Sequence, residues 1–434
     1  MRRNLFLASK IMSSKGSWSD QPDDVIKKAV MDKKLPFYAL EQAVTPDYER
    51  AIAIRREIVK EKMCPSSSSP HLLEKVPFKD YEWPRVVGQC CENILGYVPI
   101  PLGMAGPLLL DGKEVCLPMA TTEGALIAST HRGARAISES GGCTTFLLKE
   151  GMTRAPVVEV DSLEDAARVY SFCEEKFDVL KAAFESTTRF GKLKSVKCAI
   201  AGHKVHLRFT AFTGDAMGMN MITKGCDKAL EVLKEHIPSL RVLALSGNFC
   251  TDKKPSAVNW IEGRGKTVVA EAIIKAETME RILKCTVDGI LKLNVDKNLT
   301  GSALAGSIGG FNAHAANVVA AIFIATGQDP AQVVESSTCL TSMDKVGEDL
   351  LISVSMPSIE VGTVGGGTGL ATQNALLEMV GCAGANQAEP GANSRQLSRV
   401  IAGAVLCGEL SLMSGLVAGH LLSAHMKLNR KPTQ

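Results

Sequence analysis

The sequence predicts an α+β protein with more than one domain. Its 434 residues exceed the size at which a single hydrophobic core usually stops growing. Apolar residues make up 45% of the chain, which is ample for two or three cores. Between 155 and 244 short strand patterns alternate with helical ones, whereas glycine-rich helical patterns follow this stretch. We therefore expect a small α+β domain inserted into a larger, discontinuous domain.

A charged helical pattern occupies the N-terminal part of the chain. It runs from Gln21 to about Lys62, and Asp47 is well placed to cap one of its helices. Residues 65–70, Pro-Ser-Ser-Ser-Ser-Pro, are typical of a linker. We assign 21–90 to a helical N-terminal domain.

The remaining patterns divide the chain further. A small-residue helix is expected from Gly124 to Glu139. In the inserted domain, strands are expected at 156–160, 197–201 and 205–209, and helices at 161–176 and 225–235. The predicted boundaries are 91–154 and 256–434 for the large domain, 155–244 for the small domain, and 245–255 for a connecting loop.

Charge and cysteine content argue against several classes of protein. The net charge is +3 and the basic residues are spread along the chain, so no nucleic-acid partner is indicated. The 13 cysteines are odd in number and include no C-x-x-C pair, which argues against a disulfide framework or a zinc ribbon. We expect structural thiols, a reducing compartment, no metal, and small anionic ligands.

The two ends of the chain bear on membranes and location. The apolar run from Val400 to Met426 is interrupted by Glu409 and four glycines, which suits a buried helix, so no transmembrane segment is predicted. Residues 1–19 hold four basic residues and no acidic one. That composition is typical of a mitochondrial transit peptide and equally of a disordered basic tail. We expect a mitochondrial location, with the cytosol as the alternative.

The densest chemistry lies between Ser246 and Lys266. Its first half contains the run Thr251-Asp252-Lys253-Lys254-Pro255, and the proline biases the residue before it away from helical geometry. The run therefore predicts a loop that presents charge. A solvated surface turn has the same pattern, so the weight of this motif depends on the motifs that accompany it.

Further motifs occur in order along the chain. They are Glu92-Asn93-Ile94-Leu95-Gly96 continuing to Gly103, Thr121-Thr122-Glu123-Gly124, Asp215-Ala216-Met217-Gly218-Met219-Asn220-Met221, Ala325-Thr326-Gly327-Gln328-Asp329, Gly365-Gly366-Gly367, and Gly419-His420 to His425. Together with the charged loop, these motifs closely resemble the catalytic part of the class I 3-hydroxy-3-methylglutaryl-CoA reductases. The resemblance extends from about Leu35 to about Arg430.

This resemblance implies a fold, a reaction and an assembly. The fold would be a helical N-terminal part, a large discontinuous α/β CoA-binding domain and a small inserted ferredoxin-like NADP-binding domain. The reaction would be the four-electron reductive deacylation of 3-hydroxy-3-methylglutaryl-CoA to mevalonate and CoA with two NADPH, the first committed step of isoprenoid and sterol synthesis. The assembly would be a homodimer or homotetramer whose sites use both subunits, with Glu92–Gly103 at the dimer interface.

Thioester reduction needs a cation for the carbonyl oxygen, proton donors, and an acid for the departing thiolate. The resemblance makes Lys253 the cation and Asp329 the carboxylate that keeps it charged. It makes Glu123, which we expect to be partly desolvated, the proton donor to the reacting oxygen. His425 would protonate the thiolate from a terminal segment that opens between steps, and His420 would be structural. Taken alone, each group would more often be structural or solvated.

Other residues match the family's substrate contacts. Arg154, Lys254 and Lys297 resemble clamps for the glutaryl carboxylate. The rest of the substrate set, by the same resemblance, is Ser246, Asn248 and Asp252 in the loop, Asn317 near the lysine, and Tyr38, Ser129 and Arg132 for CoA.

The cofactor site is predicted from the resemblance more than from a known motif. The chain has no G-x-G-x-x-G unit, so no standard Rossmann site is expected. Gly218 permits close backbone approach and its neighbouring methionines offer an apolar wall, although such a cluster is otherwise usually core. Arg189 matches the position that meets the 2′-phosphate, which favours NADPH over NADH. The full predicted set is Thr188, Arg189, Asp215, Met217, Gly218, Met219, Asn220, Gly365 and Gly366.

Some features depart from the family or leave other functions open. Lys431 stands where many relatives carry a phosphorylatable serine, and the basic N-terminal stretch stands where most carry a membrane anchor, so we expect a soluble enzyme without that regulation. The run Gly263-Arg264-Gly265-Lys266 resembles the end of a phosphate loop but lacks its first glycine. An acyltransferase with Cys250 as nucleophile and a nearby histidine base, or a catalytically silent CoA-binding protein, would be the alternatives.

Overall fold

The computed structural model of the chain describes residues 18–62, 71 and 73–419, and it divides the chain after Ile100 into two units. The first unit spans 1–100 and the second spans 101–434. The predicted transit peptide, the linker at 65–70 and both predicted histidines, His420 and His425, lie wholly or almost wholly outside the described residues. The mitochondrial location and the finer domain boundaries stay predictions.

The first unit is helical, as the sequence predicts. Its elements are η1 (Trp18–Asp20), α2 (Asp23–Met31), η2 (Phe37–Ala39), α3 (Leu40–Ala43), α4 (Tyr48–Lys62) and α5 (Trp83–Val86). Ile26, Leu40 and Ile54 belong to its apolar core. Asp47 accepts a hydrogen bond from the backbone N–H of Arg50 at 3.0 Å, which confirms the predicted cap of α4.

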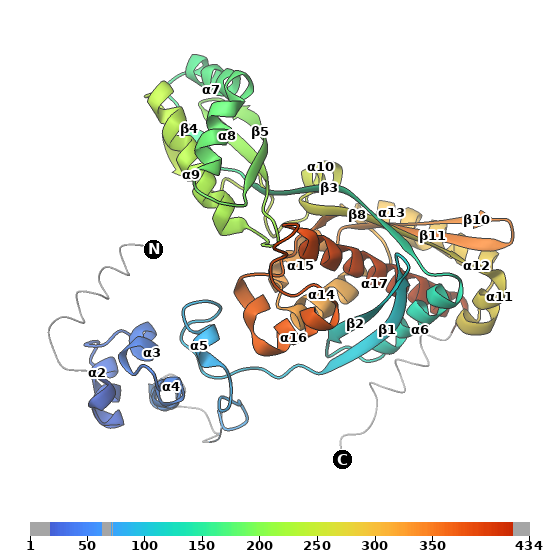
Figure 1. Cartoon of the computed structure of the whole chain (residues 1–434), viewed down its shortest axis with the longest axis horizontal. Coiled ribbons are helices and arrows are strands. Elements are labelled where there is room, and N and C mark those ends of the chain that lie inside the picture. Colours follow the sequence, from blue (N-terminus) through green and yellow to red (C-terminus); the bar gives the residue numbers. More distant parts are fainter. Residues whose placement is uncertain (1–17, 63–70, 72, 420–434) are drawn as a thin grey trace. The chain divides into compact units, whose positions relative to one another are not determined.

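The second unit is built on one large sheet and a separate hairpin (Figure 1). The hairpin pairs β1 (Leu102–Leu110) with β2 (Lys113–Ala120). The large sheet has the order β7-β4-β6-β3-β8-β11-β10-β9, and β5 also pairs with β6. Its strands are β3 (Thr144–Arg154), β4 (Val157–Glu159), β5 (Lys192–Ala201), β6 (Lys204–Phe212), β7 (Arg241–Ala244), β8 (Gly265–Ile274), β9 (Gly310–Phe311), β10 (Cys339–Val346) and β11 (Asp349–Ile359).

Strand β3 links two parts of this unit that have separate apolar cores. Its residues 144–151 pair with β8, and its last three residues pair with β6. On the β6 side, β4, β5, β6 and β7 with the intervening helices follow the β-α-β-β-α-β order, and the strand order β7-β4-β6-β5 is antiparallel throughout. The ferredoxin-like arrangement predicted for the small part is therefore confirmed.

Helices cover the sheet and form most of the larger core. They are α6 (Leu126–Glu139), α7 (Leu163–Glu175), α8 (Phe177–Glu185), α9 (Met219–His236), α10 (Ala257–Glu262), α11 (Ala276–Thr278), η3 (Met279–Leu283), α12 (Val287–Leu293), η4 (Asn294–Gly301), α13 (Ser302–Leu304), α14 (Ala315–Thr326), η5 (Pro330–Gln332), α15 (Val333–Ser336), η6 (Gly366–Gly369), α16 (Ala371–Met379) and α17 (Ala392–Val417). Helix α6 begins two residues later than predicted, and α9 begins six residues earlier.

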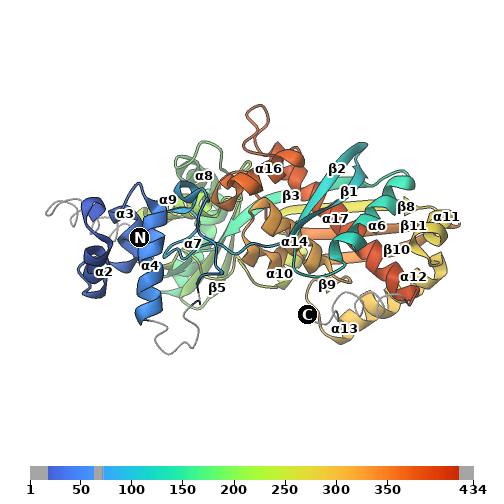
Figure 2. The ribbon, with the colours of Figure 1, turned by 90° about the horizontal axis from the view of Figure 1, so that it is seen from below.

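The long apolar helix predicted near the C-terminus is α17. It packs against α6, α14, β8 and β11, and Figure 2 shows it running alongside the sheet. Among the described residues it is the one helix that is long and apolar enough to cross a membrane, but 83% of its apolar window is buried inside the unit. Its hydrophobicity is thus accounted for by the core that it forms.

A close approach between α6 and α17 gives a test of this packing. A Cβ atom at Gly133 would lie 2.0 Å from the carbonyl oxygen of Cys407, which is backbone and cannot move alone. Gly133→Ala should therefore lower the free energy of unfolding by about 1–3 kcal/mol, although alanine by itself favours helix by about 1 kcal/mol. Denaturant titration measures the change. His131→Ala, exposed on the same helix, is the control, and equal stability of all three proteins would contradict the packing.

Candidate active site

Residues 245–256 form the predicted charged loop, between β7 and α10. Three of its residues have left-handed backbone conformations although none is glycine: φ is 63° at Asn248, 58° at Thr251 and 59° at Lys253. Such conformations persist only where surrounding contacts hold them. The shape of the loop is therefore imposed by the rest of the unit.

Hydrogen bonds from three other segments anchor this loop. Glu335 on α15 accepts the backbone N–H of Lys253 at 2.7 Å. Asn259 on α10 donates its amide to the Thr251 carbonyl at 3.3 Å. The Thr153 hydroxyl on β3 donates to the backbone carbonyl of Cys250 at 3.2 Å. The backbone at Lys253 is thus fixed without the help of its side chain.

The Lys253 ammonium lies 2.8 Å from Asp329 Oδ2. Asp329 follows the end of α14, where a Cβ atom at Gly327 would lie 2.4 Å from the carbonyl oxygen of Gly367. The hydrogen bond with Asp329 raises the pKa of Lys253, burial lowers it, and the charges of nearby carboxylates add to the rise, so that the net pKa lies above its ordinary value. The two predicted partners are therefore brought together, and Lys253 stays a cation.

Arg154, at the end of β3, lies beside the loop. Its Nη1 donates to Ser246 Oγ at 3.3 Å and lies 3.9 Å from Asp252 Oδ2. Burial raises the pKa of Asp252, but the Arg264 guanidinium and further donors outweigh burial and hold the pKa below its ordinary value. The other predicted loop residues, Asn248 and Lys254, are exposed. Two members of the predicted glutaryl clamp, Arg154 and Lys254, therefore lie together at this loop. The third, Lys297, lies on η4.

Glu123 lies with a different partner. The Asn317 amide donates to Glu123 Oε1 at 3.1 Å, and the backbone N–H of Glu123 donates to Thr121 Oγ1 at 3.0 Å. The expected desolvation of Glu123 is absent, because the residue is exposed on the bend before α6 and lies outside the helix. Within one copy of the chain, burial does not prepare this carboxyl to act as an acid.

The predicted CoA residues of the second unit gather at the C-terminal half of α17. Ser129 Oγ donates to Ser411 Oγ at 3.0 Å, and Arg132 Nε donates to the same oxygen at 3.0 Å. Lys297 is half-buried on η4, and its neighbour Asn298 contacts α17 through Met413 Sδ at 3.7 Å. Tyr38 is exposed in the first unit.

The predicted residues therefore form two groups at opposite ends of α14. Asn317, which binds Glu123, is the third residue of this helix, whereas Asp329, which binds Lys253, follows its last turn. A helix of 12 residues is about 18 Å long. One copy of the chain does not bring Glu123 and Lys253 to a single reacting carbonyl.

The start of α9 is built by close backbone contacts. Gly218, with φ of 93°, leads into the helix, and a Cβ atom there would lie 2.3 Å from the Thr213 side chain. A Cβ atom at Gly362 would lie 2.4 Å from the backbone nitrogen of Met217. Asn220 is exposed in the first turn. The first N–H groups of a helix lack intrahelical partners and favour an anionic ligand.

Thr188 and Arg189 lie next to this helix start. Thr188 Oγ1 accepts the backbone N–H of Gly191 at 3.1 Å, and a Cβ atom at Gly191 would lie 3.0 Å from Met221 Sδ. Arg189 is exposed, with its guanidinium 4.4 Å from the centre of the Phe190 ring. An exposed guanidinium fork beside a helix start suits a phosphate.

The glycine segment completes the same region. The bridge between Ala216 and Val364 places Gly365 and Gly366 beside the predicted cofactor motif. Both glycines have positive φ, and added Cβ atoms would meet nothing within 4 Å. Open backbone, a helix start and an exposed arginine together fit an anionic dinucleotide.

Asp215 has a structural part in this region. Its Oδ2 accepts the backbone N–H groups of Asn386 at 2.9 Å and Gly391 at 3.0 Å, and its Oδ1 accepts that of Ser394 at 3.0 Å. Both oxygens are used within the chain, and the residue is buried. The Asp215 side chain therefore anchors the beginning of α17, and its contact with a cofactor stays a prediction.

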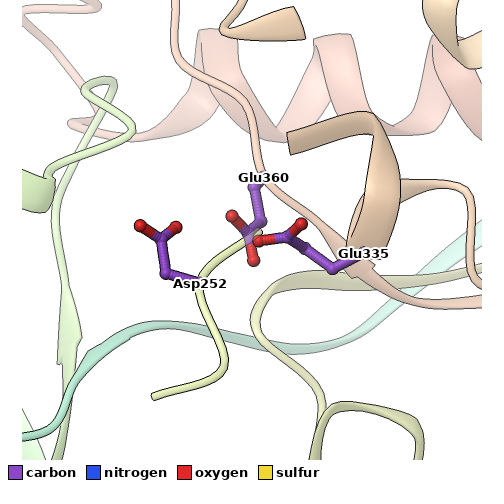
Figure 3. Close-up of side chains that lie close together, drawn as sticks. All are labelled: Asp252, Glu335 and Glu360. Atoms are coloured by element: carbon purple, nitrogen blue, oxygen red, sulfur yellow. The ribbon is translucent and has the colours of Figure 1, made fainter. Parts of the chain in front are cut away.

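Sequence reasoning missed a buried group beneath the loop. Arg264 Nη1 donates to Asp252 Oδ1 at 3.1 Å and to Glu335 Oε1 at 3.0 Å, and it also bonds Glu360. Figure 3 shows the three carboxylates gathered at one place. A metal could bind such carboxylates, but the guanidinium already lies among them. The sequence around Glu335 and Glu360 does not indicate that these residues are buried. The one sequence feature that pointed to this group is Arg264, because a glycine stands on each side of it.

Comparison with known proteins places the chain in a family. A sequence model described as hydroxymethylglutaryl-coenzyme A reductase matches residues 51–430. The 3-hydroxy-3-methylglutaryl-coenzyme A reductase 2 of Dictyostelium discoideum is 60% identical over 363 residues, which cover 83% of this chain and 69% of that protein. The reductase 1 of Hevea brasiliensis is 55% identical over 414 residues, which cover 94% and 71%. The chain belongs to the hydroxymethylglutaryl-coenzyme A reductase family.

Solved structures of reductases share the fold of this family member. A class II 3-hydroxy-3-methylglutaryl-CoA reductase from Streptococcus pneumoniae bound to NADPH has a TM-score of 0.60 at 20% identity, covering 78% of this chain and 80% of that chain. Another structure of the Streptococcus pneumoniae reductase has a TM-score of 0.60 at 19% identity, covering 95% and 90%. These likenesses confirm the α+β fold class predicted from the sequence.

The protonation of Lys253 can be tested through its partner. Because the pKa of Lys253 is raised on folding, the pair stabilises the fold below the ordinary lysine pKa of 10.5, and this contribution is lost as the pH rises through the folded pKa. Asp329→Asn removes the largest raising cause, so the free amine should form at lower pH and acylate faster at a given alkaline pH. Mass spectrometry of reagent labelling against pH measures this.

Lys113, exposed on the β1–β2 hairpin, is the internal control and should label at an unchanged rate. If Lys253 labels with the same pH dependence in the wild type and in Asp329→Asn, then Asp329 does not control its charge.

Proposed function

We infer that this chain reduces 3-hydroxy-3-methylglutaryl-CoA to mevalonate and CoA with two NADPH, the committed step toward isoprenoids and sterols. The family match over residues 51–430 supports this reaction. The observation that carries it to the site is the Lys253–Asp329 pair on a loop whose backbone is held in a left-handed conformation. The chain thereby presents a fixed cation of the kind that thioester reduction requires.

Lys253 stabilises the negative charge that develops during the reaction. Negative charge develops on the carbonyl oxygen as the thioester is reduced, and a preorganised ammonium stabilises it. Asp329 keeps the ammonium charged and in position. Arg154 and Lys254, which each bond a residue of the charged loop, bind the carboxylate of the glutaryl group and orient the substrate against Lys253.

Two residues are proposed as proton donors. Glu123 supplies the proton to the reacting oxygen, with Asn317 holding its carboxyl at 3.1 Å. His425, in the segment outside the described residues, protonates the departing CoA thiolate. Ser129, Arg132 and Tyr38 bind the CoA part of the substrate, and Lys297 belongs to the clamp for the glutaryl carboxylate.

The cofactor residues belong to the region around the start of α9. Thr188, Arg189, Met217, Gly218, Met219, Asn220, Gly365 and Gly366 would hold NADPH, and Arg189 would select it through its 2′-phosphate. NADPH when bound supplies the electrons of each reduction step. The alternative acyltransferase is disfavoured, because Cys250 is completely buried and a thioester does not reach its sulfur.

The decisive measurement is the stoichiometry of the purified chain with NADPH and 3-hydroxy-3-methylglutaryl-CoA. We expect two NADPH oxidised for each CoA thiol released, measured by absorbance and by a thiol reagent. Lys253→Ala should lose at least ~2.7 kcal/mol of transition-state stabilisation, about a hundredfold in kcat, because it removes the oxyanion partner. Thiol release without NADPH oxidation would instead identify an acyl-transfer or hydrolytic enzyme.

We propose in addition that the complete site forms between two copies of the chain, in a homodimer or homotetramer. The support is the separation of the Glu123–Asn317 and Lys253–Asp329 pairs by the length of α14. In a dimer, the first pair of one copy would face the second pair of its partner. The Glu92–Gly103 segment is the predicted interface.

Mixed dimers test this sharing. Lys253→Ala and Glu123→Ala are each expected to be inactive, but their heterodimer contains one site in which both residues are intact, so mixing after denaturation and refolding should restore activity. Lys253→Ala mixed with Asp329→Ala is the matched control. Those two residues belong to one copy, so each site keeps one defect and no activity should return. Recovery in both mixtures, or in neither, would contradict a site shared in this way.

A further inference from the structure

The group beneath the Lys253 loop joins three segments that are distant in sequence. Arg264 precedes β8, Glu335 belongs to α15, and Glu360 follows β11. All three side chains have an exposed fraction of 0%. Arg264 bonds both glutamates, and Glu335 also accepts the backbone N–H of Lys253 at 2.7 Å. The buried group therefore reaches the charged loop both through the Lys253 N–H, which Glu335 accepts, and through Asp252, which accepts from Arg264.

The charges in this group do not balance if every acid is ionised. One guanidinium meets the carboxylates of Asp252, Glu335 and Glu360 (Figure 3). Asp252 has further partners in Gln332 and Arg154, so its ionised form is satisfied. The remaining two carboxylates each place an oxygen within 4.8 Å of the other, and the Oε2 atom of each has no donor among the described residues. Two buried carboxylates that face each other do not both ionise.

We propose that Glu335 and Glu360 share one proton, and that this protonated pair, together with Arg264, holds Lys253 in its reactive conformation. The proton supplies the missing hydrogen bond between the two carboxyl groups. It also leaves one negative charge, spread over the pair, for the guanidinium. Glu335 and Glu360 are positioning residues, since they act on the substrate only through Lys253. The catalytic side of this inference rests on the reductase activity proposed above.

The surroundings favour the protonated pair. Burial is the largest cause that raises the pKa of Glu360, Arg264 opposes it, and Glu335 raises it further, so that the net pKa lies well above the ordinary 4.5. Burial likewise raises the pKa of Glu335, although the Lys253 N–H and Arg264 lower it. The pair titrates as a unit, so its second proton loss belongs to both residues.

The other charged groups at this place keep their charge. Arg264 and Arg154 remain cations, and the pKa of Asp252 is held below its ordinary value. The pKa of Lys253 is raised, mainly by Asp329. Of the carboxyl groups around the loop, the glutamate pair is thus the one whose full ionisation is opposed. The Cys250 thiol in the loop also loses a proton as the pH rises: burial raises its pKa, but the backbone N–H of Asp252 and the Arg264 guanidinium outweigh burial and hold the pKa below the ordinary 9.0. The second ionisation of the glutamate pair would place three negative charges around one guanidinium and repel Glu335 from its place beneath Lys253.

Infrared spectroscopy tests the shared proton directly. At neutral pH the full chain should show a carboxylic-acid C=O band that shifts in D2O and disappears as the pH rises. Glu360→Gln, an isosteric neutral replacement, should lose this band. Glu348→Gln, at an exposed glutamate beside the β10–β11 turn, is the matched control and should keep it. A wild-type spectrum without the band, or a band that survives in both Glu360→Gln and Glu335→Gln, would overturn the proposal.

Thermal unfolding tests the same proton by linkage. The folded chain binds a proton that the unfolded chain releases above the ordinary carboxyl pKa, so wild-type stability should fall with rising pH from that value until the pair ionises. Glu360→Gln has no such proton to lose. The difference in Tm between Glu360→Gln and wild type should therefore grow in favour of the variant as the pH rises, whereas Glu348→Gln should follow the wild type. A difference that is independent of pH would contradict the shared proton.

Turnover tests the link to Lys253. The kcat of the wild type should fall on the alkaline side of its optimum with little change in KM, and in Glu360→Gln this fall should move to higher pH. Identical kcat profiles in wild type and Glu360→Gln would overturn the positioning role. A wild type that shows the infrared band but no NADPH oxidation would reject the proposed function and uphold the shared proton.

Discussion

The constraint on which the site depends is the burial of Arg264. A guanidinium inside a protein requires acceptors for its planar set of donors, and here Thr153, Asp252, Glu335 and Glu360 supply them. Three of these acceptors, Thr153, Asp252 and Glu335, also contact the charged loop or belong to it. The need to satisfy one buried cation therefore decides where the loop runs. A lysine would not replace it, because a single ammonium lacks the forked geometry.

Strand β3 connects the buried Arg264 to the rest of the second unit, because Thr153 on this strand accepts a hydrogen bond from Arg264. Its first part pairs with β8 over the larger core, and its last three residues pair with β6 over the smaller core. Thr153 and Arg154 lie at that changeover, where one binds Arg264 and the other binds Ser246. The site is thus positioned by a strand that contacts both cores.

Helix α14 separates the two pairs of residues to which the proposed reaction assigns a part. Its apolar middle packs into the larger core, so only its two ends present polar residues: Asn317 near the start and Asp329 after the end. Each end collects its own partner, Glu123 or Lys253. A rigid helix of fixed rise does not shorten to bring the two pairs together.

Much of this protein follows from the sequence alone. Strand and helix periods, the Asp47 cap and the glycine-bounded turns determined the α+β class and most elements, because these signals act between residues that are near in the chain. The motifs, through family resemblance, also named Lys253 and Asp329, which the structure places 2.8 Å apart.

Tertiary structure alone decided the rest. The surroundings of Glu123, the structural use of Asp215 and the burial of Glu335 and Glu360 depend on partners 71 to 194 residues away in the chain. Neither desolvation nor a shared proton has a local signature, because both are set by whatever packs around a group in space.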